Sequence, residues 1–124
     1  MKPERIRIKI AERCGWSPIN TGLQAHYHWK RDSKTWQGGV EFSEDLPDYP
    51  NDLNAMHEAE SVVIEPWEID RYAHELYQVL ERFWTAKRWS DFSRHGVYYA
   101  FAHATAAQRA EAFLRAFGDW EEGE

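Results

Sequence analysis

The sequence predicts one small α+β domain, because two strongly patterned helices flank a short run of strand-forming residues. The helices are expected over residues 68–86 and 106–117, and the run between them covers residues 97–103. Val97, with the aromatic residues that follow it, suits a pleated, buried strand. A chain of 124 residues, 43% apolar, is long enough for one core and short for two. We therefore expect a single domain over residues 1–124.

The C-terminal helix carries the most regular pattern in the chain. Thr105 fits a helix N-cap, and Gln108, three residues on, completes a capping box. Gly118 stands where a left-handed residue would end the helix. The apolar positions fall on one stripe, formed by Ala106, Ala110, Phe113, Leu114 and Phe117. Such a stripe needs an apolar surface, so we expect it to pack on a small sheet that contains residues 97–103.

The N-terminal half is less regular. Residues 3–16 suit an alternating strand or a helix, and Gly15, as a C-cap in the CGW triplet, favours a helix that ends there. Residues 25–30 and 35–42 suit two short antiparallel strands joined by a polar connection.

Two further helices are predicted from the residues that would begin them. Asn51 or Asp52 fits the N-cap of a helix that runs to about Val63. Pro66 suits the first position of the next helix, whose apolar stripe continues through residues 68–86.

Composition excludes several classes of protein. A net charge of −6 without a basic stripe argues against DNA or RNA as a partner. Part of that charge lies in residues 119–124, which we expect to form an acidic, frayed tail. Cys14 is the only cysteine, so no disulfide or thiolate zinc site can form and a reducing cytosol is expected. No apolar run is long enough to cross a membrane, so we do not expect a membrane as a partner.

Few residues suggest catalysis or metal binding. His26 and His28 form an H-x-H pair that could share a metal on a strand, but no third ligand is evident. His57 beside Glu58 and Glu60 could act as an acid–base pair, or could satisfy polar groups of a helix. Phosphate loops and nucleophile motifs are absent from the sequence. We therefore predict no catalytic residue, no metal and no cofactor. The sequence favours a non-enzymatic accessory protein over an enzyme.

The candidate binding segment covers residues 25–40, where two tryptophans bracket basic residues in an acidic chain. Aromatic faces stack on bases, and lysine and arginine hold phosphates. The alternative is a hairpin with packed indoles and a solvated basic tip. The predicted site residues are Trp29, Lys30, Arg31, Lys34 and Trp36.

Three segments carry a family resemblance. PDYPNDLNAMHEAE (47–60) and ATAAQRAEAFLRAFGDW (104–120) resemble signature segments of the phage ABA sandwich domain family, and ERCGW (12–16) resembles the end of its first helix. Pro50 and Ser61 stand where family members usually have leucine and lysine. The resemblance implies a three-layer α-β-α sandwich with a short, mainly antiparallel sheet and three to four helices. It implies a phage or prophage origin and no particular activity.

The functional expectation follows from this context. We expect a phage protein, in the cytoplasm of the infected bacterium, that neutralises a host component as an inhibitor of anti-phage defence. Its target would be a small signalling nucleotide or a host defence protein. A small hydrolase of such a nucleotide and a structural accessory protein are the alternatives. The seven tryptophans in so short a chain also suggest a homo-oligomer that hides surplus apolar surface.

Polar links are expected between the two long motifs. Arg109 and Glu111 lie among the apolar positions of the C-terminal helix and could bridge to Asp48 or Glu58. We expect these contacts to specify the fold rather than to carry chemistry.

Overall fold

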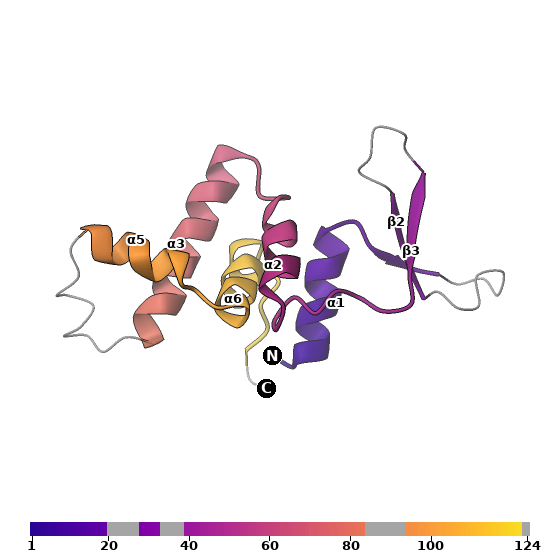
Figure 1. Ribbon diagram of the computed structural model, residues 1–124, viewed down its shortest axis with the longest axis horizontal. Helices are drawn as coiled ribbons and strands as arrows, with labels where there is room; N and C mark the ends of the chain where they lie inside the picture. The colour runs from indigo at the N-terminus through magenta and orange to yellow at the C-terminus, as the bar shows by residue number, and fades with distance from the viewer. Residues whose placement is uncertain (20–27, 33–38, 84–93, 123–124) are drawn as a thin grey trace.

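The computed structural model describes residues 1–19, 28–32, 39–83 and 94–122 (Figure 1). Within them the chain forms five helices and a three-stranded antiparallel sheet, which confirms the α+β class. In chain order the elements are α1 (Pro3–Arg13), β1 (Ser17–Pro18), β2 (Trp29–Asp32), β3 (Val40–Ser43), α2 (Leu53–Glu60), α3 (Pro66–Phe83), α5 (Arg94–Ala102) and α6 (Ala106–Ala116).

Helix α1 ends as the CGW triplet predicts. Gly15 adopts a left-handed backbone with φ of 93°, and the Trp16 amide donates to the Ala11 carbonyl at 3.0 Å. This closure is typical of a helix C-terminus and turns the Trp16 side chain into the core. The helical alternative for residues 3–16 is therefore correct.

Strands β2 and β3 form the predicted hairpin, with Arg31 opposite Glu41 and Trp29 opposite Ser43. The two-residue strand β1 pairs with the other side of β2. Both strands begin inside the predicted ranges and end after them, because Arg31 and Asp32, expected in the polar connection, belong to β2, and Ser43 belongs to β3. Of the remaining predicted strand residues, His28 and Gly39 lie next to the strands but not in them, and 25–27 and 35–38 lie outside the described residues.

Helices α2 and α3 begin where their caps predict. The Asp52 side chain accepts hydrogen bonds from the amides of Asn54 and Ala55 at 3.0 and 3.3 Å. Pro66 is the first residue of α3. The predicted stripe of α3 is buried at Leu76, Val79 and Leu80.

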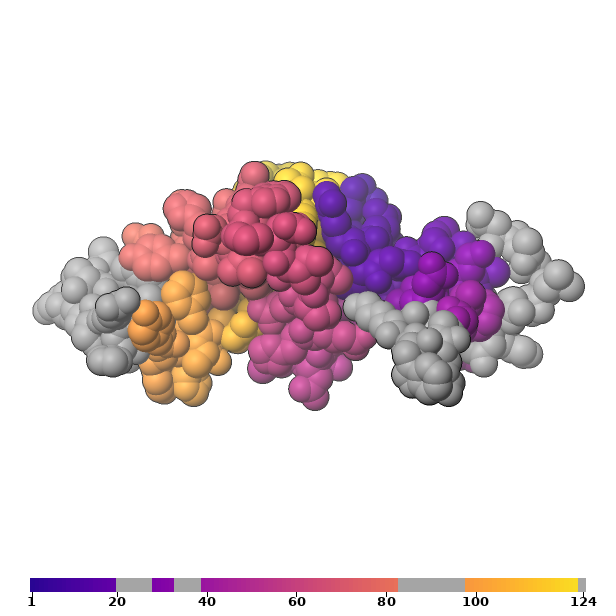
Figure 2. All heavy atoms as spheres, turned by 90° about the horizontal axis from the view of Figure 1, so that it is seen from above, coloured from indigo at the N-terminus to yellow at the C-terminus, as the bar shows by residue number. Residues whose placement is uncertain are grey.

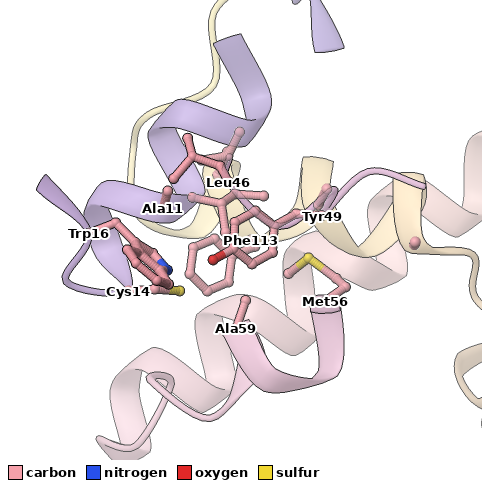
Figure 3. Packing of buried hydrophobic residues seen from close by; sticks show 12 residues of the cluster. Ala11, Cys14, Trp16, Leu46, Tyr49, Met56, Ala59 and Phe113 are labelled. Carbon is pink, nitrogen blue, oxygen red and sulfur yellow. The ribbon is translucent and has the colours of Figure 1, made fainter. Parts of the chain in front are cut away.

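Helix α6 is the centre of the main core. Its capping box is complete, because the Gln108 amide donates to the Thr105 hydroxyl while the Thr105 amide donates to the Gln108 side chain. Phe113 and Leu114 are fully buried, as predicted. Figure 3 shows Phe113 surrounded by labelled side chains from α1, α2 and the segment before α2. Gly118 follows with a left-handed φ of 78°, which confirms its predicted place after the helix.

The predicted strand over residues 97–103 is wrong, because this segment belongs to helix α5. A strand buried on both sides would cover Tyr98 and Tyr99, yet they are 55% and 60% exposed. The buried residues are instead Ala100, within the helix, and Ala104, two residues after it. They pack with Leu76, Val79 and Leu80 of α3 and with Ala112 of α6. This close packing outweighs the β propensity of the aromatic residues.

The three-layer sandwich is not confirmed. The sheet lies at one end of an elongated molecule, beyond α1, while α3 and α5 lie toward the other end (Figures 1 and 2). Because the expected strand is a helix, the described chain also has one helix more than the three to four predicted.

The acidic C-terminal residues have arginine partners. The ion pairs are Arg13–Asp119, Arg5–Glu121 and Arg115–Glu122, at 2.8, 3.0 and 2.7 Å. The hydrogen bond from Arg5 holds the pKa of Glu121 below its ordinary value, and the bond from Arg115 does the same for Glu122. Residues 123–124 lie outside the described residues.

Candidate interaction site at the sheet end

Arg31 lies on the side of β2 that faces the helices. Its guanidinium donates to Glu41 of β3 at 2.9 Å and to Glu58 of α2 at 2.8 Å. The same group lies over the Trp16 ring, 4.5 Å from its centroid. Only 12% of the Arg31 side chain is exposed. Burial opposes its charge, but the hydrogen bonds to Glu58 and Glu41 outweigh that effect and raise the pKa of Arg31.

Arg31 therefore joins the hairpin to the helical body. One side chain connects β2, β3, α2 and Trp16, three residues after α1, through two charge-assisted bonds and one cation–π contact. The two carboxylates hold Nε and one terminal nitrogen, so a phosphate group would compete with them for this largely buried guanidinium.

Trp29, two residues before Arg31, also faces the helices and is half-buried against the main core. It lines a hollow of about 170 Å³ together with Glu4, Arg7, Ile8, Asp45 and Leu46. Arg7 donates to the backbone carbonyl of Leu46 and forms an ion pair with Asp45 at 3.2 Å. A hydrogen bond from the Leu46 amide, helped by Arg7, lowers the pKa of Asp45. The hollow is below the roughly 300 Å³ at which ligand pockets begin.

Lys30 points to the opposite side of the sheet and is exposed. It borders a second hollow of about 160 Å³, lined also by Gly15, Ser17, Arg31, Asp32 and Val40. Lys30 and Arg31 both border this hollow, but the side chains of the three described site residues point to two sides of the sheet. Trp29 and Arg31 face the body, whereas Lys30 faces outward.

Lys34 and Trp36 lie outside the described residues, as does His26 of the H-x-H pair. His28 is exposed, and its amide donates to the Ser43 carbonyl at 3.0 Å. In the described ranges, no three histidine, cysteine or acidic side chains come together as a metal would require.

Val40 and Phe42 were missed as surface residues by the sequence analysis. They lie on the same outward side as Lys30 and are 48% and 41% exposed. The sequence signal was the alternation of apolar and polar residues in β3. That alternation shows that the side chains point to two sides, but not which side meets the helices.

His57 and Glu60 belong to a polar network between helices. His57 Nδ1 lies 2.8 Å from one Glu60 oxygen, and the other oxygen accepts from the Tyr72 hydroxyl at 2.6 Å. Arg109 donates to that second oxygen at 3.1 Å. Burial raises the pKa of Tyr72, and its bond to Glu60 raises it further. Glu60 is thus engaged by three side chains from α2, α3 and α6.

Arg109 extends this network to α5. It donates to the carbonyls of Phe101 and Ala104, at 2.7 and 3.1 Å, where α5 ends. The expected polar link between the two long motifs is present, with Glu60 as the partner of Arg109 rather than Asp48 or Glu58. Glu111 contacts Arg82 and Arg115 instead. Arg109 thus satisfies backbone carbonyls at the end of α5 and just after it, while His57 joins the network through the Glu60 carboxylate.

A third hollow lies between α3 and α6. It has a volume of about 400 Å³, is open to solvent and is lined by Glu75, Gln78, Glu81, Arg82 and Arg115. It lacks the aromatic and apolar walls typical of small-molecule sites. Its two arginines both contact Glu111.

Comparisons with protein-family models, curated proteins and solved structures found no match to this chain. The resemblance to the phage ABA sandwich family therefore stays a prediction from the three motif segments. The described helices include none that is long and apolar enough to span a membrane.

Proposed function

We propose that this chain is a non-enzymatic phage accessory protein that binds a host protein and thereby inhibits bacterial anti-phage defence. The phage origin and the cytoplasm of the infected bacterium as its location rest on the resemblance of residues 47–60 and 104–120. We also propose that the chain shares the three-layer sandwich of that family and that it associates with itself.

The state of Arg31 favours a protein target over a signalling nucleotide. A nucleotide site needs a cation that can turn toward a phosphate, but two carboxylates already hold this guanidinium at 2.8 and 2.9 Å. The hollows beside Trp29 and Lys30 hold about 170 and 160 Å³, which is small for a nucleotide. Binding through a surface needs no such pocket.

The arrangement of His57 disfavours the hydrolase alternative. His57 lines none of the three hollows described above, so none of them places a substrate-sized space beside its ring. A general base must lie within hydrogen-bond reach of the proton that it removes.

We assign the host contact to the part of residues 25–40 that contains Lys34 and Trp36. Tryptophan is enriched among the few residues that dominate protein interfaces, and lysine there would speed association with an acidic partner. This assignment rests on the sequence.

A plating assay tests the proposal. Bacteria that each carry one defence system would express the chain or its variants, and phage plating efficiency would be measured. We expect the natural sequence to restore plating on at least one host and Trp36→Ser to abolish the effect, since interface tryptophans contribute about 2 kcal/mol or more.

The matched control is Arg71→Glu, an exposed position on α3 far from the hairpin in sequence. It should keep full activity, and all variants should keep the melting temperature of the natural sequence. Failure to restore plating on any host, or full activity of Trp36→Ser, would contradict the proposal.

A further inference from the structure

We propose that two copies of this chain associate face to face through the outward side of the β2–β3 hairpin. This outward face is formed by Lys30, Asp32, Val40 and Phe42. The inference deepens the self-association included in the proposed function. Its test uses the purified chain alone, so it can fail or succeed independently of host binding.

Strand alternation places all four residues on one side of the sheet. Along β2, Trp29 and Arg31 are partly buried, whereas Lys30 and Asp32 are exposed. Along β3 the exposed positions are Val40 and Phe42, at 48% and 41%. Arg31 fixes the inner side of the sheet to α2 through its ion pair with Glu58. The outer side therefore faces away from the helices.

The register arranges these residues as two cross-strand pairs. Lys30 lies opposite Phe42, and Asp32 lies opposite Val40. The two residues of opposite charge, Lys30 and Asp32, therefore lie on β2. The two apolar residues, Phe42 and Val40, lie opposite them on β3.

This pattern is complementary to itself under a two-fold rotation. Consider an axis between the two facing sheets, perpendicular to the strands and midway between the two pairs. Rotation about it brings Lys30 of one copy over Asp32 of the other, twice in the dimer. It also brings Phe42 over Val40, again twice. Isologous two-fold contacts of this kind are the commonest in soluble oligomers.

Charge complementarity is the reason for choosing a second copy as the occupant. A face with one cation, one anion and two apolar groups matches its own rotated image, whereas a strongly charged partner would meet one like charge. The patch is small beside the roughly 800 Å² per partner of a standard interface. We therefore expect association in the micromolar range.

Sedimentation equilibrium over a series of concentrations measures this association. Lys30→Asp gives a face with two negative charges, and Asp32→Lys gives one with two positive charges. Each variant alone places like charges opposite each other, so we expect dimerisation at least about tenfold weaker than that of the natural sequence.

An equimolar mixture of the two variants is the decisive sample. In a mixed dimer every charge faces its opposite, so we expect association at least as strong as that of the natural sequence. A change in the folding of either variant could not produce this recovery, because it requires contact between two molecules.

Arg71→Glu, with the same reversal of a cationic side chain on α3, should dimerise like the natural sequence. A natural sequence that stays monomeric through the high micromolar range would overturn the proposal. So would a mixture of the two variants that associates no better than either variant alone.

Discussion

At the scale of single residues, the contacts of Arg31 show whether this charge serves ligand binding or the fold. The sequence shows a basic residue between two tryptophans, which is typical of nucleotide contacts. In the fold its guanidinium meets Glu41, Glu58 and the Trp16 ring. Those partners are 10, 27 and 15 positions away along the chain. No local pattern reveals such contacts, so the sequence could identify the segment but not the use of this charge.

Replacing Arg31 by alanine should therefore destabilise the fold. Two carboxylates would lose their shared partner, and we expect the free energy of unfolding to fall by about 1–3 kcal/mol. Lys30→Ala, the neighbouring cation on the exposed side, should change it by no more than about 0.5 kcal/mol. Urea denaturation followed by tryptophan fluorescence measures both.

The ligand-binding interpretation of Arg31 makes the opposite prediction. If its main role were to hold a nucleotide, Arg31→Ala would leave the stability of the free protein unchanged. Equal unfolding midpoints for Arg31→Ala and Lys30→Ala would thus contradict the scaffold role described above.

At the scale of elements, the sequence predicts well where local chemistry sets a boundary. The Thr105–Gln108 capping box, the Asp52 cap and the left-handed Gly15 each involve residues a few positions apart. Residues 97–103 have no such signal. Their helix depends on Ala100 packing against α3 and α6 and on Arg109 holding the carbonyls at its end. Those contacts form only in the folded chain.

A pair of identical substitutions tests the helical state of α5. Ala100 is buried against α3 and α6, whereas Ala102 is exposed. Ala100→Leu should overpack the contact and lower the free energy of unfolding by about 1–3 kcal/mol, while Ala102→Leu should change it by no more than about 0.5 kcal/mol. Chemical denaturation gives both values.

The control is built into this comparison, because residues two apart share one side of a strand. If residues 97–103 formed the strand that the sequence suggests, the two leucines would enter the same environment. Equal losses of stability would then be observed, and the helix would be rejected.

At the scale of the whole molecule, polar groups that could suggest chemistry connect elements instead. Glu60 and Arg109 join α2, α3, α5 and α6, and Arg31 joins the sheet to the helices. The described surface instead offers exposed apolar side chains outside the outward face, such as Ile64 and Trp67, which are 70% and 61% exposed. This distribution is the physical basis for proposing a protein partner.

The central claim is that the chain acts on a host protein and does not hold a nucleotide. Native mass spectrometry of the protein, isolated from bacteria whose defence system has been activated by phage, tests it most directly. We predict a defined complex with one host polypeptide, which forms again from the purified components, and no nucleotide on the chain. A stoichiometric adduct with the mass of a nucleotide would contradict the claim.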